Sequence, residues 1–257
     1  MTKISNEKIL AALNVQKEIF GDILFEPKVN LEKPVINTDL PYYIRQEKLQ
    51  VKESKGEMDQ LFQNQNEEWQ NSNTLAELNK LICNCKKCEL HKNRNKFVFG
   101  SGNPDADVMV IGEGPGAEED IQGLPFVGRA GKLLTDILKA INFERDEVYI
   151  ANIVKCRPPG NRTPLPVEME TCIPYLKKQI ELIKPKLILC LGLTAAKGLM
   201  KKKESLTKLR GNVYEYEGIN VMVTFHPAAL LRNPNWKRDC WEDVKKFRKL
   251  YDELNAD

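Results

Sequence analysis

The stretch "DVMVIGEGPGAEEDIQGLPFVG", residues 107–128, decides the fold of this chain. It opens with an apolar run, "DVMVIG", which is typical of a strand that is buried on both faces of a parallel sheet. The loop that follows turns on three glycines and a proline, "GEGPG", and then carries further carboxylates. A glycine-rich loop after a strand often binds phosphate, but a phosphate-binding loop needs a lysine and a hydroxyl group after its glycines. This loop is acidic instead, so we expect it to bind a neutral polar ligand.

The rest of the chain repeats the same alternation of strand and helix. Buried-strand runs are predicted at 107–112, 147–154, 186–192 and 219–225, and helices at 129–141, 166–183 and 236–254. This order predicts a three-layer α/β/α fold with a central, mainly parallel four-stranded sheet. Ligands of such sheets bind beyond the carboxyl ends of the strands. The loops of interest are therefore 112–128, 152–165, 192–197 and 226–235.

The N-terminal part of the chain differs from the rest. After one short amphipathic stretch, residues 1–74 are polar, rich in Gln and Asn, and weakly periodic. We interpret them as an extension that is partly helical or disordered, with an unknown function. Regular structure is expected from residue 75, with Thr74 as the cap of a first helix. The prediction is thus an extension, 1–74, followed by one domain, 75–257.

Composition narrows the class of protein. No apolar run approaches the roughly 20 residues of a membrane span, and the N-terminus lacks the apolar centre of a signal peptide. We therefore expect a cytoplasmic protein that does not bind membranes. The formal charge is +3, and residues 81–257 carry +6, which permits a nucleic-acid partner without requiring one.

The cysteines allow two interpretations. Cys85 and Cys88 form a C-x2-C pair, and Cys156 and Cys172 stand alone further along the chain. Four thiolates can hold zinc or an iron–sulfur cluster, but this spacing is equally compatible with unrelated core cysteines. Cys83 could compete with Cys85 as a ligand.

Three side chains converge on the predicted ligand edge of the sheet. Phe126 supplies a ring beside small residues, and Asn152 ends the second strand with an amide that donates and accepts at once. His226 begins the loop after the last strand. Each has an ordinary structural alternative, as a core ring, a turn residue or a structural histidine. Their convergence predicts a pocket for a uracil-like or cytosine-like base.

At this point the chain resembles a known family, the type-4 iron–sulfur uracil-DNA glycosylases of the uracil-DNA glycosylase superfamily. The resemblance covers residues 78–254 and is carried by "CKKCELHKNRNKFVFGSGNPDADVMVIGEGPGAEED", "GLPFVGRAGKLL", "VYIANIVKCRPPGNRTPLP", "KLRG" and "TFHPAALLRNP". It implies a structural 4Fe–4S cluster bound by Cys85, Cys88, Cys156 and Cys172. It also implies hydrolysis of the bond between uracil and its sugar, the first step of base excision repair.

The resemblance also assigns roles within the pocket. Uracil flipped out of the DNA stack would lie on Phe126, with Asn152 at its O4 and N3–H and His226 at its O2. Glu119 would lie near the C5 side, which must exclude the methyl group of thymine. Glu113, Gly114 and Pro115 would line the O2 edge and the water position. Family-one enzymes have an aspartate in "GQDPY" where this chain has Gly114, so the group that activates water is open.

Contacts with DNA are expected around the same loops. Leu230 or Leu231 would insert into the space that the base leaves, and basic side chains would bind phosphates in a salt-sensitive way. The candidates for phosphate contact are Arg157, Arg162 and Arg232. Each is equally compatible with a solvated surface charge.

We therefore expect a monomeric enzyme that removes uracil from single- or double-stranded DNA. One alternative is a catalytically weak DNA-binding module associated with a polymerase or another repair partner. Another is a related glycosylase with a different base preference. Residues 1–74 could bind a repair or replication protein.

Overall fold

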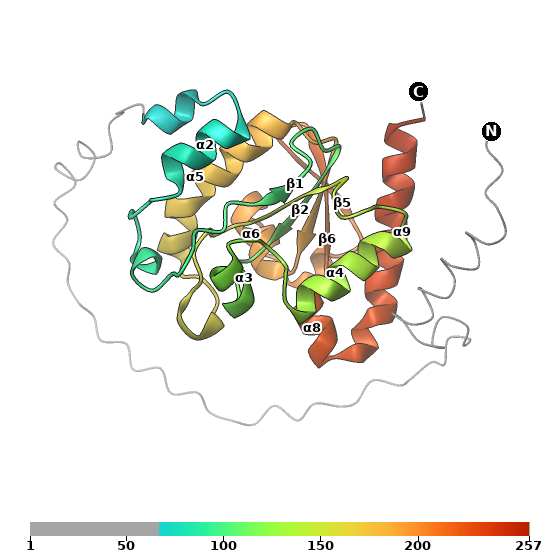
Figure 1. The fold of residues 1–257 in the computed structure, drawn as a ribbon. Coiled ribbons are helices and arrows are strands. Elements are labelled where there is room, and N and C mark those ends of the chain that lie inside the picture. Colours follow the sequence, from blue (N-terminus) through green and yellow to red (C-terminus); the bar gives the residue numbers. More distant parts are fainter. Residues whose placement is uncertain (1–66, 257) are drawn as a thin grey trace, which may run out of the picture.

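The computed structural model describes residues 67–256, which form three layers around one mixed sheet (Figure 1). The strand order is β1-β3-β2-β4-β6-β5. The four strands predicted from the sequence form its parallel centre. They are β2 (Val108–Gly112), β3 (Tyr149–Asn152), β4 (Leu187–Leu191) and β6 (Ile219–Thr224). Part of the proposed extension, residues 1–66, lies outside the described residues.

The sheet has six strands, so the prediction of four is corrected. β1 (Ser101–Gly102) pairs with β3 and β5 (Val213–Tyr216) pairs with β6, both antiparallel. Both are edge strands and therefore lack the continuous apolar character of buried parallel strands. β1 has only two residues, and β5 alternates between exposed and half-buried positions. The two antiparallel strands thus border the parallel centre without changing the three-layer class.

Helices cover both faces of the sheet, as predicted. In β2, Met109 and Ile111 pack on one face and Val108 and Val110 on the other. The first face is covered by helices that share one core cluster with it: α2 (Leu75–Ile82), α5 (Pro166–Ile183) and α6 (Leu193–Met200). The second face is covered by α4 (Arg129–Ala140), α8 (Pro227–Arg232) and α9 (Lys237–Leu254). Within residues 67–256, none of these helices combines the length and the apolar character that a membrane crossing requires.

Short helices lie in the connections. They are α3 (Ala117–Gln122) and α7 (Leu206–Leu209), with the 3-10 turns η2 (Glu68–Asn71), η3 (Glu89–Lys92), η4 (Pro159–Asn161) and η5 (Pro234–Trp236). Thr74 caps α2 as expected, because its hydroxyl group accepts from the Glu77 amide. The packed fold begins before residue 75, since the ring of Trp69 in η2 is buried against Tyr175. The expected boundary at 74/75 therefore falls inside packed structure.

Candidate functional site

A pocket of about 410 Å³ lies where the parallel strands end. Its walls come from the loop after β2, the end of β3, the loop around η4, and α8. In Figure 1, α3, α8 and the connection between β3 and α5 lie along one side of the molecule. The pocket contains all seven residues that the sequence assigned to base binding: Glu113, Gly114, Pro115, Glu119, Phe126, Asn152 and His226. These residues thus lie together at the carboxyl edge of the sheet, and their binding of a base stays a prediction.

The amide of Asn152 is the most informative group in this pocket. The residue is 2% exposed, and its buried Oδ1 has no hydrogen-bond partner among residues 67–256. Gly112, at the end of the neighbouring strand, makes room for it. A methyl group at Gly112 would overlap Asn152 Oδ1 and lie 2.7 Å from two ring carbons of Phe126. Because a buried acceptor without a partner costs free energy, this atom points to a ligand that donates a hydrogen bond.

The Phe126 ring is held by an unusual backbone. Its φ is +51°, in the left-handed region that aromatic residues rarely adopt. The segment is fixed by Arg145, which donates to the carbonyl of Pro125 at 2.7 Å. Gly131 allows α4 to pass directly behind, where a side chain would collide with the backbone of Phe126. The ring is therefore placed by strain and packing together, as is common for functional positions.

Two carboxylates of the loop, those of Glu119 and Asp120, accept hydrogen bonds from backbone amides. Glu119 accepts hydrogen bonds from the amides of Gly116, Val127 and Gly128 at 3.0–3.2 Å, and so ties the start of α3 to the start of α4. Asp120 is fully buried and accepts from the backbone and side chain of Asn95. The acidic character of the loop is thus largely internal. Glu113 is half-buried and lines the pocket.

His226 begins α8 and faces the Phe126 ring at 5.5 Å between centroids. Its Nδ1 accepts from the Ala228 amide at 3.2 Å. Loss of solvation lowers the pKa of the imidazole to about 4, and Arg232 contributes in the same direction, while Glu119 opposes it. The ring is therefore neutral at pH 7, and because Nδ1 is an acceptor, the proton sits on Nε2. His226 thus offers the pocket a neutral N–H donor.

The residues expected to contact DNA are placed differently from one another. Arg162 and Arg232 line the pocket, whereas Arg157 donates to Asn161 beside it. Arg162 makes two hydrogen bonds to Glu168, at 2.6 and 2.8 Å, which offset its charge. The two candidate leucines, Leu230 and Leu231, also differ in their exposure.

Leu230 is fully buried in the core, so it has no freedom to insert into DNA, and that part of the expectation is corrected. Leu231 is 39% exposed on the same helix. Successive residues of a helix point about 100° apart, and this difference in direction separates the two. Leu231 is therefore the one of the pair that can reach a nucleic acid.

Cys85, Cys88, Cys156 and Cys172 line one small cavity. Cys83 lies outside its lining, at the end of α2, where its thiol contacts the carbonyl of Lys80. Cys190 and Cys240 are buried elsewhere in the core. The four cysteines that the resemblance names thus lie together in the structure, and their binding of a cluster stays a prediction.

Two hydrogen bonds favour thiolates at this site, whereas burial raises the pKa of Cys88, Cys156 and Cys172. Arg94 donates to Cys156 Sγ at 3.1 Å, and the Tyr175 hydroxyl donates to Cys85 Sγ at 3.2 Å. Hydrogen bonds to sulfur favour the thiolate form and are typical of iron–sulfur ligands. Within residues 67–256, no three histidine, cysteine or carboxylate side chains are arranged to hold a single metal ion. An iron–sulfur cluster would be held by four cysteine thiolates and is not a single ion.

Sequence reasoning missed several residues of both sites. The pocket is also lined by Gly116, Ala130, Pro158, Asn161, Thr163 and Ala228. Lys155 is fully buried next to Cys172, and its ammonium group donates to Gln179 at 2.6 Å. Burial lowers the pKa of Lys155 to about 8. A lysine directly before a candidate ligand cysteine was the available signal, but only the fold shows that this lysine points inward.

Comparisons with known proteins agree with this geometry. A family model described as the uracil DNA glycosylase superfamily matches residues 99–245. The chain is 42% identical over 185 residues to a type-4 uracil-DNA glycosylase of Archaeoglobus fulgidus, covering 69% of this chain and 93% of that protein. It is 49% identical over 168 residues to one of Thermotoga maritima, covering 64% and 88%. It is 46% identical over 186 residues to one of Sulfurisphaera tokodaii, covering 69% and 84%.

Proposed function

The chain belongs to the uracil-DNA glycosylase superfamily and to its type-4 members, and we propose that it removes uracil from DNA by hydrolysing the N-glycosidic bond. This places it in DNA repair, as the enzyme that starts base excision. A catalytically weak binding module is not favoured, because the chain is 42% and 49% identical to proteins named as type-4 uracil-DNA glycosylases.

One observation carries this proposal, the unpartnered Oδ1 of Asn152. Uracil offers an N3–H donor next to its O4 acceptor, and a single amide can bind both. Cytosine has an acceptor at N3 and a donor at C4, so it would leave buried polar groups unpaired, at about 1–3 kcal/mol each. The ring of Phe126 supplies the stacking surface for the flipped base.

His226 is proposed to stabilise the leaving group. As the bond to the sugar breaks, negative charge develops on uracil O2, and a donor already in place stabilises that charge. The neutral imidazole with its proton on Nε2 is suited to this role. The N–H group does not have to lose bound water during the reaction, because folding has already removed that water.

This chain has Gly114 at the position where family-one enzymes have an aspartate. A side chain there would approach Val154 within 2.7 Å, so the loop passes close to the end of β3. Glu113 is the neighbouring carboxylate in the pocket. We propose that Gly114 and Pro115 shape the water site and that Glu113 orients the water, while departure of the stabilised uracil anion limits the rate. Glu119 holds the wall on which exclusion of the thymine methyl group depends.

We propose that Cys85, Cys88, Cys156 and Cys172 hold a 4Fe–4S cluster. Such a cluster would supply a structural cross-link between the segment before β1 and the segment around α5, and hydrolysis needs no redox step. The hydrogen bonds from Arg94 and Tyr175 support this set of ligands.

DNA is proposed to lie across the side of the molecule that carries α3, α8 and η4. Leu231 would occupy the space left by the base, while Arg157, Arg162 and Arg232 would contact phosphates. We further propose that the enzyme is a cytoplasmic monomer. In this proposal its catalytic domain is 75–257 together with the packed residues just before it, and the extension serves a repair or replication partner.

The test is excision of a single uracil from single-stranded and duplex oligonucleotides, with thymine and cytosine in its place as controls. We expect cleavage at uracil alone, and its loss in His226→Ala and Asn152→Ala. Asn103→Ala removes a half-buried amide at the opposite end of the sheet, where its Oδ1 accepts from the Asp105 amide, and should leave excision unchanged. Failure of the iron-loaded, DNA-binding protein to excise uracil would support the binding module instead.

A further inference from the structure

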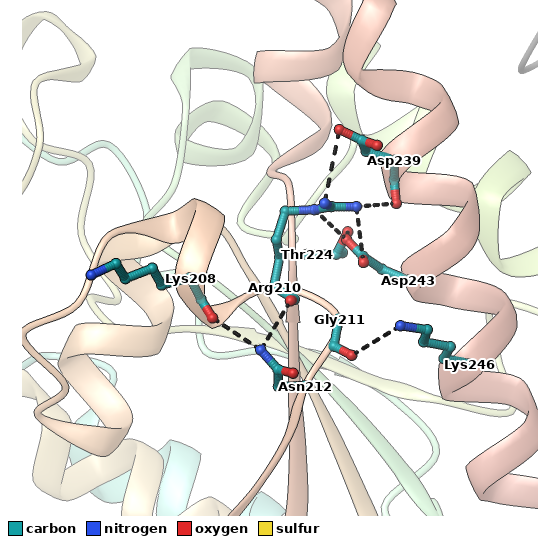
Figure 2. A network of polar contacts seen from close by, with 8 residues as sticks. All are labelled: Lys208, Arg210, Gly211, Asn212, Thr224, Asp239, Asp243 and Lys246. Carbon is teal, nitrogen blue, oxygen red and sulfur yellow. Dashed lines mark hydrogen bonds and ion pairs between the residues drawn. The ribbon is translucent and has the colours of Figure 1, made fainter. Parts of the chain in front are cut away.

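Arg210, in the "KLRG" segment 208–211, lies outside the pocket and has no role in the proposed reaction. Its guanidinium group reaches α9, where it makes two hydrogen bonds of 3.0 Å to the carboxylate of Asp243. It also donates to the backbone carbonyl of Asp239 at 2.5 Å. Figure 2 shows the guanidinium group between these two aspartates. The pair is specific in geometry, because two parallel hydrogen bonds fix the orientation of both groups.

Asp243 connects this ion pair to the last residue of β6. Its side chain is 4% exposed, and its Oδ2 accepts from the hydroxyl group of Thr224 at 2.8 Å. The backbone carbonyl of Thr224 accepts from the Gly192 amide at 2.8 Å. Thr224 is thus held from α9 through its side chain and from the end of β4 through its backbone. It stands two residues before His226.

The residue between them is held by the same arginine. The guanidinium carbon of Arg210 lies 5.1 Å from the centroid of the Phe225 ring, which also stacks on the ring of Trp236 at 5.1 Å. The Gly211 amide also donates to the carbonyl of Val223 at 3.2 Å. Every residue from 223 to 225 therefore contacts either the "KLRG" segment or the aspartate that it binds.

Resting on the proposed function, we propose that Arg210 is a positioning residue for uracil excision. With Asp243 it fixes Thr224 and Phe225, and so sets the direction in which His226 enters the pocket. Buried ion pairs often add little stability compared with apolar side chains of similar size. The pair of Arg210 and Asp243 would orient the imidazole of His226, and apolar side chains in their place would not.

The electrostatic environment of Asp243 agrees with this geometry. Burial raises the pKa of its carboxyl group to about 6, against the hydrogen bond from Thr224 and the charge of Arg210, which lower it. Asp239 on the same helix also raises it. Lys246 faces the segment from α9 and binds the carbonyl of Gly211. Arg210 is thus the cation that pairs directly with the buried carboxylate.

Arg248 provides a matched control on the same helix. It also pairs with a carboxylate, Asp252, at 2.8 Å, and lies over two rings, Phe143 at 4.8 Å and Tyr251 at 5.2 Å. It packs far from His226, against the carbonyls that follow α4. Loss of Arg248 therefore tests what the loss of a half-buried, paired and stacked arginine does by itself.

The experiment compares Arg210→Gln with Arg248→Gln in the full-length, iron-loaded protein. We expect Arg210→Gln to lower single-turnover excision about 10- to 100-fold, because small displacements of a catalytic group have effects of this size. Binding of uracil-containing DNA should stay unchanged, and Arg248→Gln should excise at the wild-type rate. Thr224→Val removes only the hydroxyl group, and it should lower excision in the same direction even if Arg210→Gln fails to fold.

Histidine ring NMR gives a readout that mere destabilisation does not move. The sequence has two histidines, so His91 serves as an internal reference for His226. We expect Arg210→Gln and Thr224→Val to shift the ring signals of His226 and to leave those of His91 in place. Wild-type excision with equal rates in both arginine variants and an unchanged His226 spectrum would overturn the inference. Absence of wild-type excision would instead reject the proposed function.

Discussion

Replacement of Asn152 by leucine should separate stability from activity. Asn152 Oδ1 is buried without a hydrogen-bond partner, and such a group costs about 1–3 kcal/mol. Leucine has a similar volume and removes that cost, although its branched shape takes back up to about 1.5 kcal/mol through imperfect packing. We therefore expect Asn152→Leu to raise the free energy of unfolding by about 1 kcal/mol. For a domain of this size, that corresponds to a rise in Tm of about 2–4 °C.

Excision should change in the opposite direction. Without the amide, uracil loses two hydrogen bonds and enters an apolar site with its own polar groups unpaired. At about 1.5 kcal/mol for each bond, the barrier rises by about 3 kcal/mol, which slows excision by at least about 10²-fold. Single-turnover cleavage of a uracil-containing oligonucleotide measures this loss, and thermal unfolding at equal iron content measures the stability.

Gln179→Leu is the matched control, since it removes a buried amide whose hydrogen bonds are all made. Gln179 accepts from Lys155 and donates to Tyr149 and to the carbonyl of Phe99. Its loss leaves the Lys155 ammonium group buried and unpaired, at a cost of about 3–5 kcal/mol. If Asn152→Leu lowers Tm as Gln179→Leu does, Oδ1 is not an unsatisfied atom and the reasoning fails. If Asn152→Leu still excises uracil, the pocket does not bind the base in this way.

Three further changes test other parts of the site. Gly112→Ala should displace both the reading amide and the stacking ring and slow excision about 10²-fold, whereas Gly218→Ala, in an open turn with φ +81°, should lower Tm and spare excision. The pH profile of kcat/KM for excision should show no loss near pH 6.5, because burial lowers the pKa of His226 to about 4. The stability that the neutral imidazole contributes is complete above pH 6.5 and is lost as pH falls towards 4. A loss of excision centred near pH 6.5 would contradict this prediction. Cys172→Ser should remove most bound iron and visible absorbance and lower Tm, whereas Cys190→Ser should keep the iron; equal iron in both variants would reject the proposed ligand set.

The parallel centre of the fold was predictable from local sequence, because its strands are predominantly apolar. The edge strands were not, since β1 has two residues and Val213 in β5 is 50% exposed. The short helices α3 and α8 were missed for a related reason. They have six residues each, too few for a periodic pattern, and their N-cap residues are Gly116 and His226.

The pocket was predictable as a set of residues, because parallel strands bring their carboxyl ends to one edge. The sequence did not show which of two adjacent residues points into the core. Leu230 and Leu231 differ only in their direction on a helix, and the sequence offers both equally. The contact between Arg210 and Asp243 joins residues 33 positions apart, and nothing local in either segment indicates the other.

The strand order explains why the pocket needs glycines as much as it needs its polar side chains. Asn152 ends β3 and His226 follows β6, with β2 and β4 between them. Three strand spacings separate the two residues by roughly 14 Å. The ends of the intervening strands must therefore carry no bulky side chains if one base is to contact both residues. β2 ends at Gly112, and Gly192 directly follows the last residue of β4. Gly112 leaves room for the amide and ring on one side, and Gly192, where a side chain would lie 3.2 Å from the Cβ of His226, leaves room on the other.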